Sequence, residues 1–199
     1  MPLLHHQEMT MKFPTKIAAL ALLLTASLTP LLNAQEDDLF AFVPDGGRTL
    51  LGGLVAEGIV DPAEVLSASR GKDEWLGFLR GLSAAGLDET QMETLAAYLA
   101  STMPAAEKGG QTIETGGLAL PRDGRDLTLE FCQSCHIITV VVTQDRTREA
   151  WLGTMNKPSH VEIGTTQAER EALADYLVLN GGIPIEEVPE ELRAGGATY

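Results

Sequence analysis

The chain has 199 residues, of which 44% are hydrophobic and 21% charged, with 20 glycines, 10 prolines and two cysteines. This composition indicates a globular protein with one medium domain or two small ones, and it excludes the collagen-like, disordered and disulfide-rich classes. The formal net charge of −14 at pH 7 disfavours nucleic acid as a partner and favours basic partner proteins.

The first predicted element is a secretory signal peptide over residues 1–34. Two lysines precede an apolar run over residues 17–24, and Ala34 stands just before the acidic, polar segment 35–38. A transmembrane anchor is the alternative, but the run is shorter than the roughly 20 apolar residues that span a bilayer. Cleavage after Ala34 predicts a periplasmic mature chain without a membrane span. Its formal charge would be −15, because two lysines and one glutamate leave with the peptide.

Two segments of the mature chain resemble each other. Asp73-Glu74-Trp75-Leu76-Gly77 matches Arg148-Glu149-Ala150-Trp151-Leu152-Gly153, and Leu95-Ala96-Ala97-Tyr98-Leu99 matches Leu173-Ala174-Asp175-Tyr176-Leu177. The Trp and the Tyr are 23 residues apart in the first copy (75 to 98) and 25 in the second (151 to 176). The pattern predicts an internal repeat of a small helical unit, over residues 35–104 and 123–182.

The last helix of each copy is predicted from its capping residues. Asp88 with Gln91, and Thr166 with Glu169, have the N-cap and N3 spacing of a capping box, and each pair begins seven residues before the matched leucine (88 to 95 and 166 to 173). The matched leucines and tyrosine fall at i, i+3 and i+4, which predicts an apolar stripe. Helix breakers follow both segments.

Residues 105–122, between the copies, have the composition of a linker. They contain Gly109-Gly110, Gly116-Gly117 and Pro121 and show no clear period. Residues 183–199 are predicted to form a C-terminal tail.

The segment Cys132-Gln133-Ser134-Cys135-His136 has the pattern C-x-x-C-H, preceded by residues 126–131, which can form a helix. Two thiols about one helical turn apart can form thioethers to the two vinyl groups of a haem, and the adjacent histidine then reaches the iron. A zinc site would need further Cys or His ligands, a thioredoxin-like pair would need a βαβ context, and a structural disulfide would leave the histidine unexplained. The motif therefore predicts one covalently attached haem c at Cys132 and Cys135, with His136 as an axial ligand.

Two side chains are candidates for the other axial position. His160 is the only other histidine of the mature chain, and Met155 is the only methionine of the second copy. Met155 follows Trp151 by four residues, which places both on one helix face, where ordinary core packing is the alternative. His160 follows Pro158, a helix breaker, and is predicted to lie in a loop that folds back over the ring, with a surface histidine as the alternative. The β-branched run 137–143 is predicted to be a buried loop or short extended segment over the cofactor.

Residues 123–182 resemble the class I c-type cytochrome superfamily, in which a helix runs into C-x-x-C-H and is followed by a middle helix with a Trp, a ligand loop and a final amphipathic helix. The resemblance implies an all-α fold of two small cytochrome c-like units, the second binding haem. The first unit, without Cys or His, would be a degenerate haem-free copy. In the superfamily the distal ligand, usually Met, lies about 16 to 18 residues before the aromatic of the last helix. His160 lies 16 residues before Tyr176 and Met155 lies 21 before it, so the resemblance favours bis-histidine ligation.

Within the superfamily, the chain is similar to small cytochrome domains that work with periplasmic dehydrogenases and often carry an Arg-rich segment before the Trp, as residues 146–151 do. Arg146 and Arg148 are candidates to pair with haem propionates, with solvated surface charge as the alternative. We expect an electron carrier rather than an enzyme, exchanging electrons with a periplasmic dehydrogenase or another cytochrome. Two alternatives are the cytochrome subunit of a periplasmic oxidoreductase complex, and a haem-based sensor with a displaceable sixth ligand.

Overall fold

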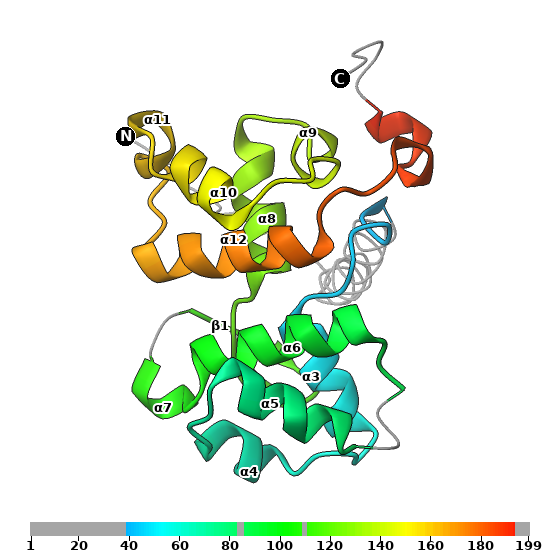
Figure 1. Cartoon of the computed structure of the whole chain (residues 1–199), viewed down its shortest axis with the longest axis vertical. Helices are drawn as coiled ribbons and strands as arrows, with labels where there is room; N and C mark the ends of the chain where they lie inside the picture. Colours follow the sequence, from blue (N-terminus) through cyan, green and yellow to red (C-terminus); the bar gives the residue numbers. More distant parts are fainter. Residues whose placement is uncertain (1–38, 83–85, 109–110, 194–199) are drawn as a thin grey trace, which may run out of the picture. The chain divides into compact units, whose positions relative to one another are not determined.

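The computed structural model describes residues 39–82, 86–108 and 111–193, and the described chain is mainly α-helical with one two-stranded antiparallel sheet (Figure 1). The predicted signal peptide, residues 1–34, lies outside the described residues. None of the helices within the described ranges combines the length and the apolar character needed to cross a membrane. The residues from Phe42 onward form one unit, in which we distinguish an N-terminal lobe, residues 42–121, and a C-terminal lobe, residues 122–193.

The N-terminal lobe packs its helices around one apolar core that includes Trp75, Leu95 and Leu99. Its elements are α3 (Gly47–Ala56), α4 (Pro62–Ser67), α5 (Lys72–Arg80), α6 (Glu89–Thr102), α7 (Ala105–Lys108), β1 (Thr112–Thr115) and β2 (Leu118–Pro121). The C-terminal lobe contains α8 (Gly124–Phe131), a 3₁₀ turn (Cys132–Ser134), α9 (Thr139–Val142), α10 (Arg148–Met155), α11 (Pro158–Val161), α12 (Gln167–Asn180) and two 3₁₀ turns in the tail (Ile185–Glu187 and Glu190–Leu192).

The segment predicted as a linker, residues 105–122, contains a β-hairpin instead. β1 pairs with β2, and the two-residue turn Gly116–Gly117 connects them. The φ angles of these glycines, +59° and +81°, suit a type I′ turn, and glycine adopts such positive values without steric strain. Leu120 on β2 is fully buried in the core of the N-terminal lobe. The hairpin is therefore a packed part of that lobe and leads directly into α8.

The capping predictions for the last helix of each lobe are confirmed. Asp88 accepts a hydrogen bond from the Gln91 amide at 2.8 Å at the start of α6, and Thr166 accepts one from the Glu169 amide at 3.2 Å at the start of α12. Both helices complete a capping box, and each ends just before a helix breaker, α6 at Thr102 before Pro104 and α12 at Asn180 before Gly181.

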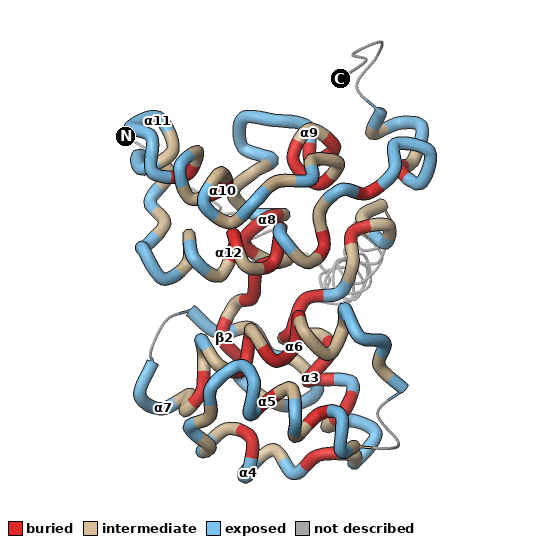
Figure 2. Tube along the Cα trace, viewed as in Figure 1, coloured by how far each residue is buried: buried red, intermediate tan, exposed pale blue. Residues whose placement is uncertain are grey.

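Two predictions in the C-terminal lobe are wrong. The run 137–143 was predicted to be a loop or an extended segment, but residues Thr139–Val142 form the short helix α9, whose buried positions stand out in Figure 2. His160 was placed in a loop, but it lies in α11. Pro158 begins that helix rather than breaking one, because the first helical position needs no backbone N–H.

Matched contacts in the two lobes extend the repeat found in the sequence. A Cβ added to Gly47 at the start of α3 would collide with Tyr98 of α6, and one added to Gly124 at the start of α8 would collide with Tyr176 of α12. In each lobe a glycine thus allows the first helix to cross the last at close range. The middle helices match too, since the guanidinium of Arg70 lies 4.7 Å from the ring centroid of Trp75, and that of Arg146 lies 4.6 Å from that of Trp151.

Candidate cofactor site

A cavity of about 420 Å³ opens in the C-terminal lobe. Its volume falls within the range of about 300–1,000 Å³ that is typical of small-molecule and cofactor sites. Side chains from α8 and the turn after it, and from α9, α10, α11 and α12, form its wall. Every helix of the C-terminal lobe therefore contributes to this one cavity.

The three chemically active residues of the C-x-x-C-H motif all line the cavity. α8 ends at Phe131 and the chain tightens into a 3₁₀ turn at Cys132, after which the His136 amide donates to the Cys132 carbonyl at 3.2 Å. This turn brings all three residues to the cavity wall, where His136 is exposed. Cys132 is partly buried, Cys135 is exposed, and neither thiol is in a disulfide.

The Cys132 thiol differs from a reactive cysteine. Burial raises the pKa of Cys132 to about 11, so that the thiol stays protonated at neutral pH. Thiol–disulfide oxidoreductases work through a thiolate, which requires a lowered pKa. The environment of Cys132 thus disfavours a thioredoxin-like function for the pair.

Both candidate distal ligands line the same cavity. Met155 lies one turn after Trp151 on α10, and both side chains are buried, which confirms the predicted shared face. His160 lies on α11, partly buried, with its Nδ1 3.2 Å from the hydroxyl of Ser159. The structure therefore brings the motif, Met155 and His160 to one cavity, although they come from three different elements.

Three hydrogen-bond donors are grouped on the cavity wall. The indole Nε1 of Trp151 is buried and has no partner. Arg146 stacks on the ring of Trp151 and donates to Thr154 Oγ1 at 2.9 Å, and Arg170 at the start of α12 also lines the cavity. Guanidinium and indole groups donate hydrogen bonds but accept none, so this wall suits an anionic acceptor.

The structure separates the two arginines that the sequence proposed together. Arg146 reaches the cavity, whereas Arg148 pairs with Asp175 at 2.5 Å and is absent from its lining. Arg170 had no signal in the sequence, because a charged residue in the first turn of an amphipathic helix is indistinguishable from a solvated one until the fold turns it inward.

Most of the remaining wall is apolar, with Gln144, Thr154, Ser159 and Thr165 as its polar members. Its apolar members are Phe131, Val140, Val141, Ile163, Leu173 and Leu177. Val140 and Val141 come from α9, so part of the segment 137–143 lines the cavity, although as a helix. An apolar wall with a few placed polar groups is the usual character of a cofactor pocket.

Among the described residues, no three or more His, Cys, Asp or Glu side chains gather as they would around a metal held by protein ligands alone. A haem iron needs fewer protein ligands, because the porphyrin supplies four nitrogen ligands and the chain supplies only the axial ones.

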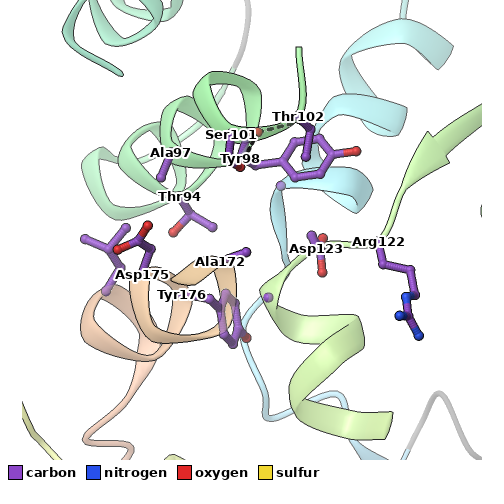
Figure 3. Close-up of a pocket in the computed structure, with 13 residues that line it drawn as sticks. Thr94, Ala97, Tyr98, Ser101, Thr102, Arg122, Asp123, Ala172, Asp175 and Tyr176 are labelled. Atoms are coloured by element: carbon purple, nitrogen blue, oxygen red, sulfur yellow. Dashed lines mark hydrogen bonds between the residues drawn. The ribbon is translucent and has the colours of Figure 1, made fainter. Parts of the chain in front are cut away.

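A second, narrow cavity of about 20 Å³ lies where α6 and α12 meet the start of α8 (Figure 3). Thr94 and Tyr98 line it from α6, Asp175 and Tyr176 from α12, and Asp123 from the segment before α8. This volume holds about one water molecule, so the cavity is too small for a cofactor or substrate.

Comparison with protein families, curated proteins and solved structures finds no match for this chain. Its function is therefore inferred from its residues and their geometry.

Proposed function

We propose that this chain is a periplasmic c-type haem protein that carries electrons, with one haem attached to Cys132 and Cys135 and coordinated by His136. One observation carries the proposal. A single cavity is lined by both thiols, by the adjacent imidazole and, from α10 and α11, by the two side chains able to bind iron from the other face.

The residues of the cavity fit a haem in three respects. The apolar wall suits the porphyrin plane, and two thiols one turn apart match its two vinyl groups. The unpartnered Nε1 of Trp151, with Arg146 stacked on its ring and Arg170 on the same cavity wall, would receive the carboxylates of the propionates. In the structure both arginines donate to uncharged oxygens, Arg146 to Ala150 and Thr154, and Arg170 to Asn156, Thr165 and Gln167.

When bound, the haem would supply a one-electron couple between ferric and ferrous iron. The chain's own residues would fix the group covalently and supply the protein ligands of the iron. We assign the distal position to His160, with Met155 as the alternative. Two imidazole ligands favour ferric iron more than an imidazole and a thioether do, so the assignment implies a lower reduction potential.

We further propose that each lobe is a small cytochrome c-like unit and that only the C-terminal lobe binds haem. The matched glycine–tyrosine crossings and arginine–tryptophan stacks support a common plan for the two lobes. The redox partner that we propose is a periplasmic dehydrogenase or another cytochrome. As a subunit of a periplasmic oxidoreductase complex, the chain would use the same electron-transfer chemistry.

Covalent attachment can be tested directly. The full chain is produced in a host with the periplasmic machinery that attaches haem, and haem is measured on the denatured polypeptide after electrophoresis. The wild-type chain should retain about one haem, Cys132→Ser with Cys135→Ser should retain none, and Ser134→Ala should match the wild type because it leaves both thiols. A folded wild-type chain without retained haem would overturn the proposal.

The distal ligand is tested by His160→Ala and Met155→Ala, each examined by absorption and low-temperature paramagnetic resonance of the ferric protein. His160→Ala should convert the iron from low to high spin, and Met155→Ala should leave it low spin. The reverse result would assign Met155, and a low-spin spectrum in both variants would exclude both assignments as sole ligand.

A further inference from the structure

An arginine of the N-terminal lobe binds helix α8, which leads into the C-x-x-C-H segment. The guanidinium of Arg48 on α3 donates to both oxygens of Asp126 on α8, from Nε at 2.7 Å and from Nη2 at 2.6 Å. Its third nitrogen donates to Thr115 Oγ1 in the hairpin at 2.6 Å. The Arg48 and Asp126 side chains are only 14% and 12% exposed, so the pair is largely shielded from water and its geometry is fixed by the fork of the guanidinium.

A single carboxylate caps helices of both lobes. Asp123 accepts the Asp126 amide of α8 at 2.9 Å on one oxygen and the Arg48 amide of α3 at 2.8 Å on the other. Asp123 is 2% exposed and lies on the segment that leads from β2 into α8 (Figure 3). A Cβ added to Gly46, the residue before α3, would collide with this carboxylate, so the close approach needs glycine there.

The last helix of each lobe binds the segment that leads into the first helix of the other lobe. The Tyr98 hydroxyl on α6 donates to the Pro121 carbonyl before α8 at 2.9 Å, and the Tyr176 hydroxyl on α12 donates to the Pro44 carbonyl before α3 at 2.5 Å. Each last helix therefore holds the entry to the first helix of the other lobe. The start of α8 is fixed by residues from both lobes, and its other end carries the C-x-x-C-H motif.

We propose that Arg48 is a positioning residue for haem attachment and coordination: through Asp126 and the shared cap Asp123, it makes the haem-free lobe a brace that sets the orientation of α8. The inference rests on the proposed function for its consequence at the iron. The mechanical part, that Arg48 holds α8, does not depend on haem. The N-terminal lobe thus acts on the site without contributing a side chain to the cavity.

The test uses the full chain and three variants. Arg48→Leu removes the donors while keeping much of the aliphatic volume, and Arg48→Lys keeps the charge but not the two-pronged geometry. Arg80→Leu is the matched control, since Arg80 pairs with Glu89 inside the N-terminal lobe and has no contact with α8. Amide hydrogen exchange is measured in α8 and, as an internal reference, in α10. The paramagnetic resonance of ferric iron is recorded for the haem-loaded protein.

Arg48→Leu should speed exchange of the α8 amides by about tenfold or more while the α10 amides change by less than about twofold, because the shielded Asp126 keeps only the Asp123 amide and loses its cationic partner. The low-spin signal should broaden or split, Arg48→Lys should restore part of both properties, and Arg80→Leu should change neither. Equal acceleration in α8 and α10, or unchanged α8 exchange, would overturn the brace.

The brace and the proposed function fail in different ways. If no haem attaches, exchange in α8 of the haem-free chain still decides the brace. If haem attaches normally and α8 exchange is unaffected by Arg48→Leu, the brace is wrong while the haem assignment stands. Should Arg48→Leu not fold, Arg48→Lys is judged by the same comparison of α8 with α10.

Discussion

The crossing of α8 over α12 can be tested by replacing Gly124 with alanine. The new Cβ would collide with Tyr176 and would lie 2.9 Å from the Ala172 carbonyl oxygen. Tyr176 cannot move aside easily, because it is buried and its hydroxyl is bound to the Pro44 carbonyl. The helices must therefore separate, and the C-x-x-C-H segment that follows α8 would move with them.

The magnitude follows from two opposing effects. Overpacking of a filled interior costs about 1–3 kcal/mol. Replacing glycine by alanine in a helix recovers at most about 1 kcal/mol, and less at a first-turn position. We therefore expect Gly124→Ala to lower the free energy of unfolding by about 1–2 kcal/mol, and to lower the fraction of chains that carry haem.

Urea unfolding followed by far-ultraviolet circular dichroism provides the measurement, with Gly153→Ala as the matched control. Gly153 lies inside α10 and a Cβ there would meet no atom within 4 Å, so this variant should be as stable as the wild type or more stable by up to about 1 kcal/mol. If Gly124→Ala behaved like Gly153→Ala, the close helix crossing described here would be refuted.

Three further outcomes are expected. Burial, reinforced by the neighbouring Asp126, raises the pKa of Asp123 to about 6 from 3.8, so between these values the folded chain holds a proton that the unfolded chain releases. The free energy of unfolding should therefore fall as pH rises from about 4 to about 6. Asp123→Asn should flatten that slope in urea titrations at several pH values. Trp151→Phe removes a buried, unpartnered N–H together with part of a buried, stacked ring, and it should lower the melting temperature of the haem-loaded chain more than that of the haem-free chain. In the haem-free chain at pH 8, iodoacetamide should alkylate the exposed Cys135 well before Cys132, whose burial raises the pKa of its thiol to about 11; equal rates by mass spectrometry would contradict that environment.

Local sequence signals predicted the parts of the fold that are determined locally. The capping boxes at Asp88 and Thr166 fixed the starts of α6 and α12, because a cap and its N3 residue are neighbours in the chain. The five-residue motif likewise identified Cys132, Cys135 and His136, and the structure places all three on one cavity. Met155 was correctly placed on the face of Trp151 by helical period alone.

The errors arose where one local signal had two meanings. Gly116-Gly117 was interpreted as a linker, although two glycines between short strands also suit a type I′ hairpin, and strands of four residues give little alternation to detect. Pro158 was interpreted as a helix breaker, although it stands at the first position of α11, where proline is favoured.

Other features depend on contacts between distant residues and left no local trace. Asp123 and Arg48 are 75 residues apart in the chain, and nothing near either one predicts that a single carboxylate would cap two helices. Arg170 faces the cavity only because α12 packs beside α10. Such long-range pairs require the assembled fold.

The repeat separates the contacts that both lobes share from the groups that the proposed haem would require. When the lobes are aligned on their matched glycines, Gly47 and Gly124, corresponding positions are 77 residues apart. The positions that correspond to Cys132, Cys135 and His136 are then Val55, Gly58 and Ile59, and none of these side chains could bind haem. There the chain turns at Gly58, with φ +70°, and Ile59 packs against the apolar core. Yet this lobe keeps the glycine–tyrosine crossing and the arginine–tryptophan stack. These contacts are common to both lobes, whereas the groups on which the proposed chemistry depends are found in the C-terminal lobe alone. Introducing thiols into the N-terminal lobe should therefore not make it bind haem, because Leu54, Val60 and Leu79 fill its core.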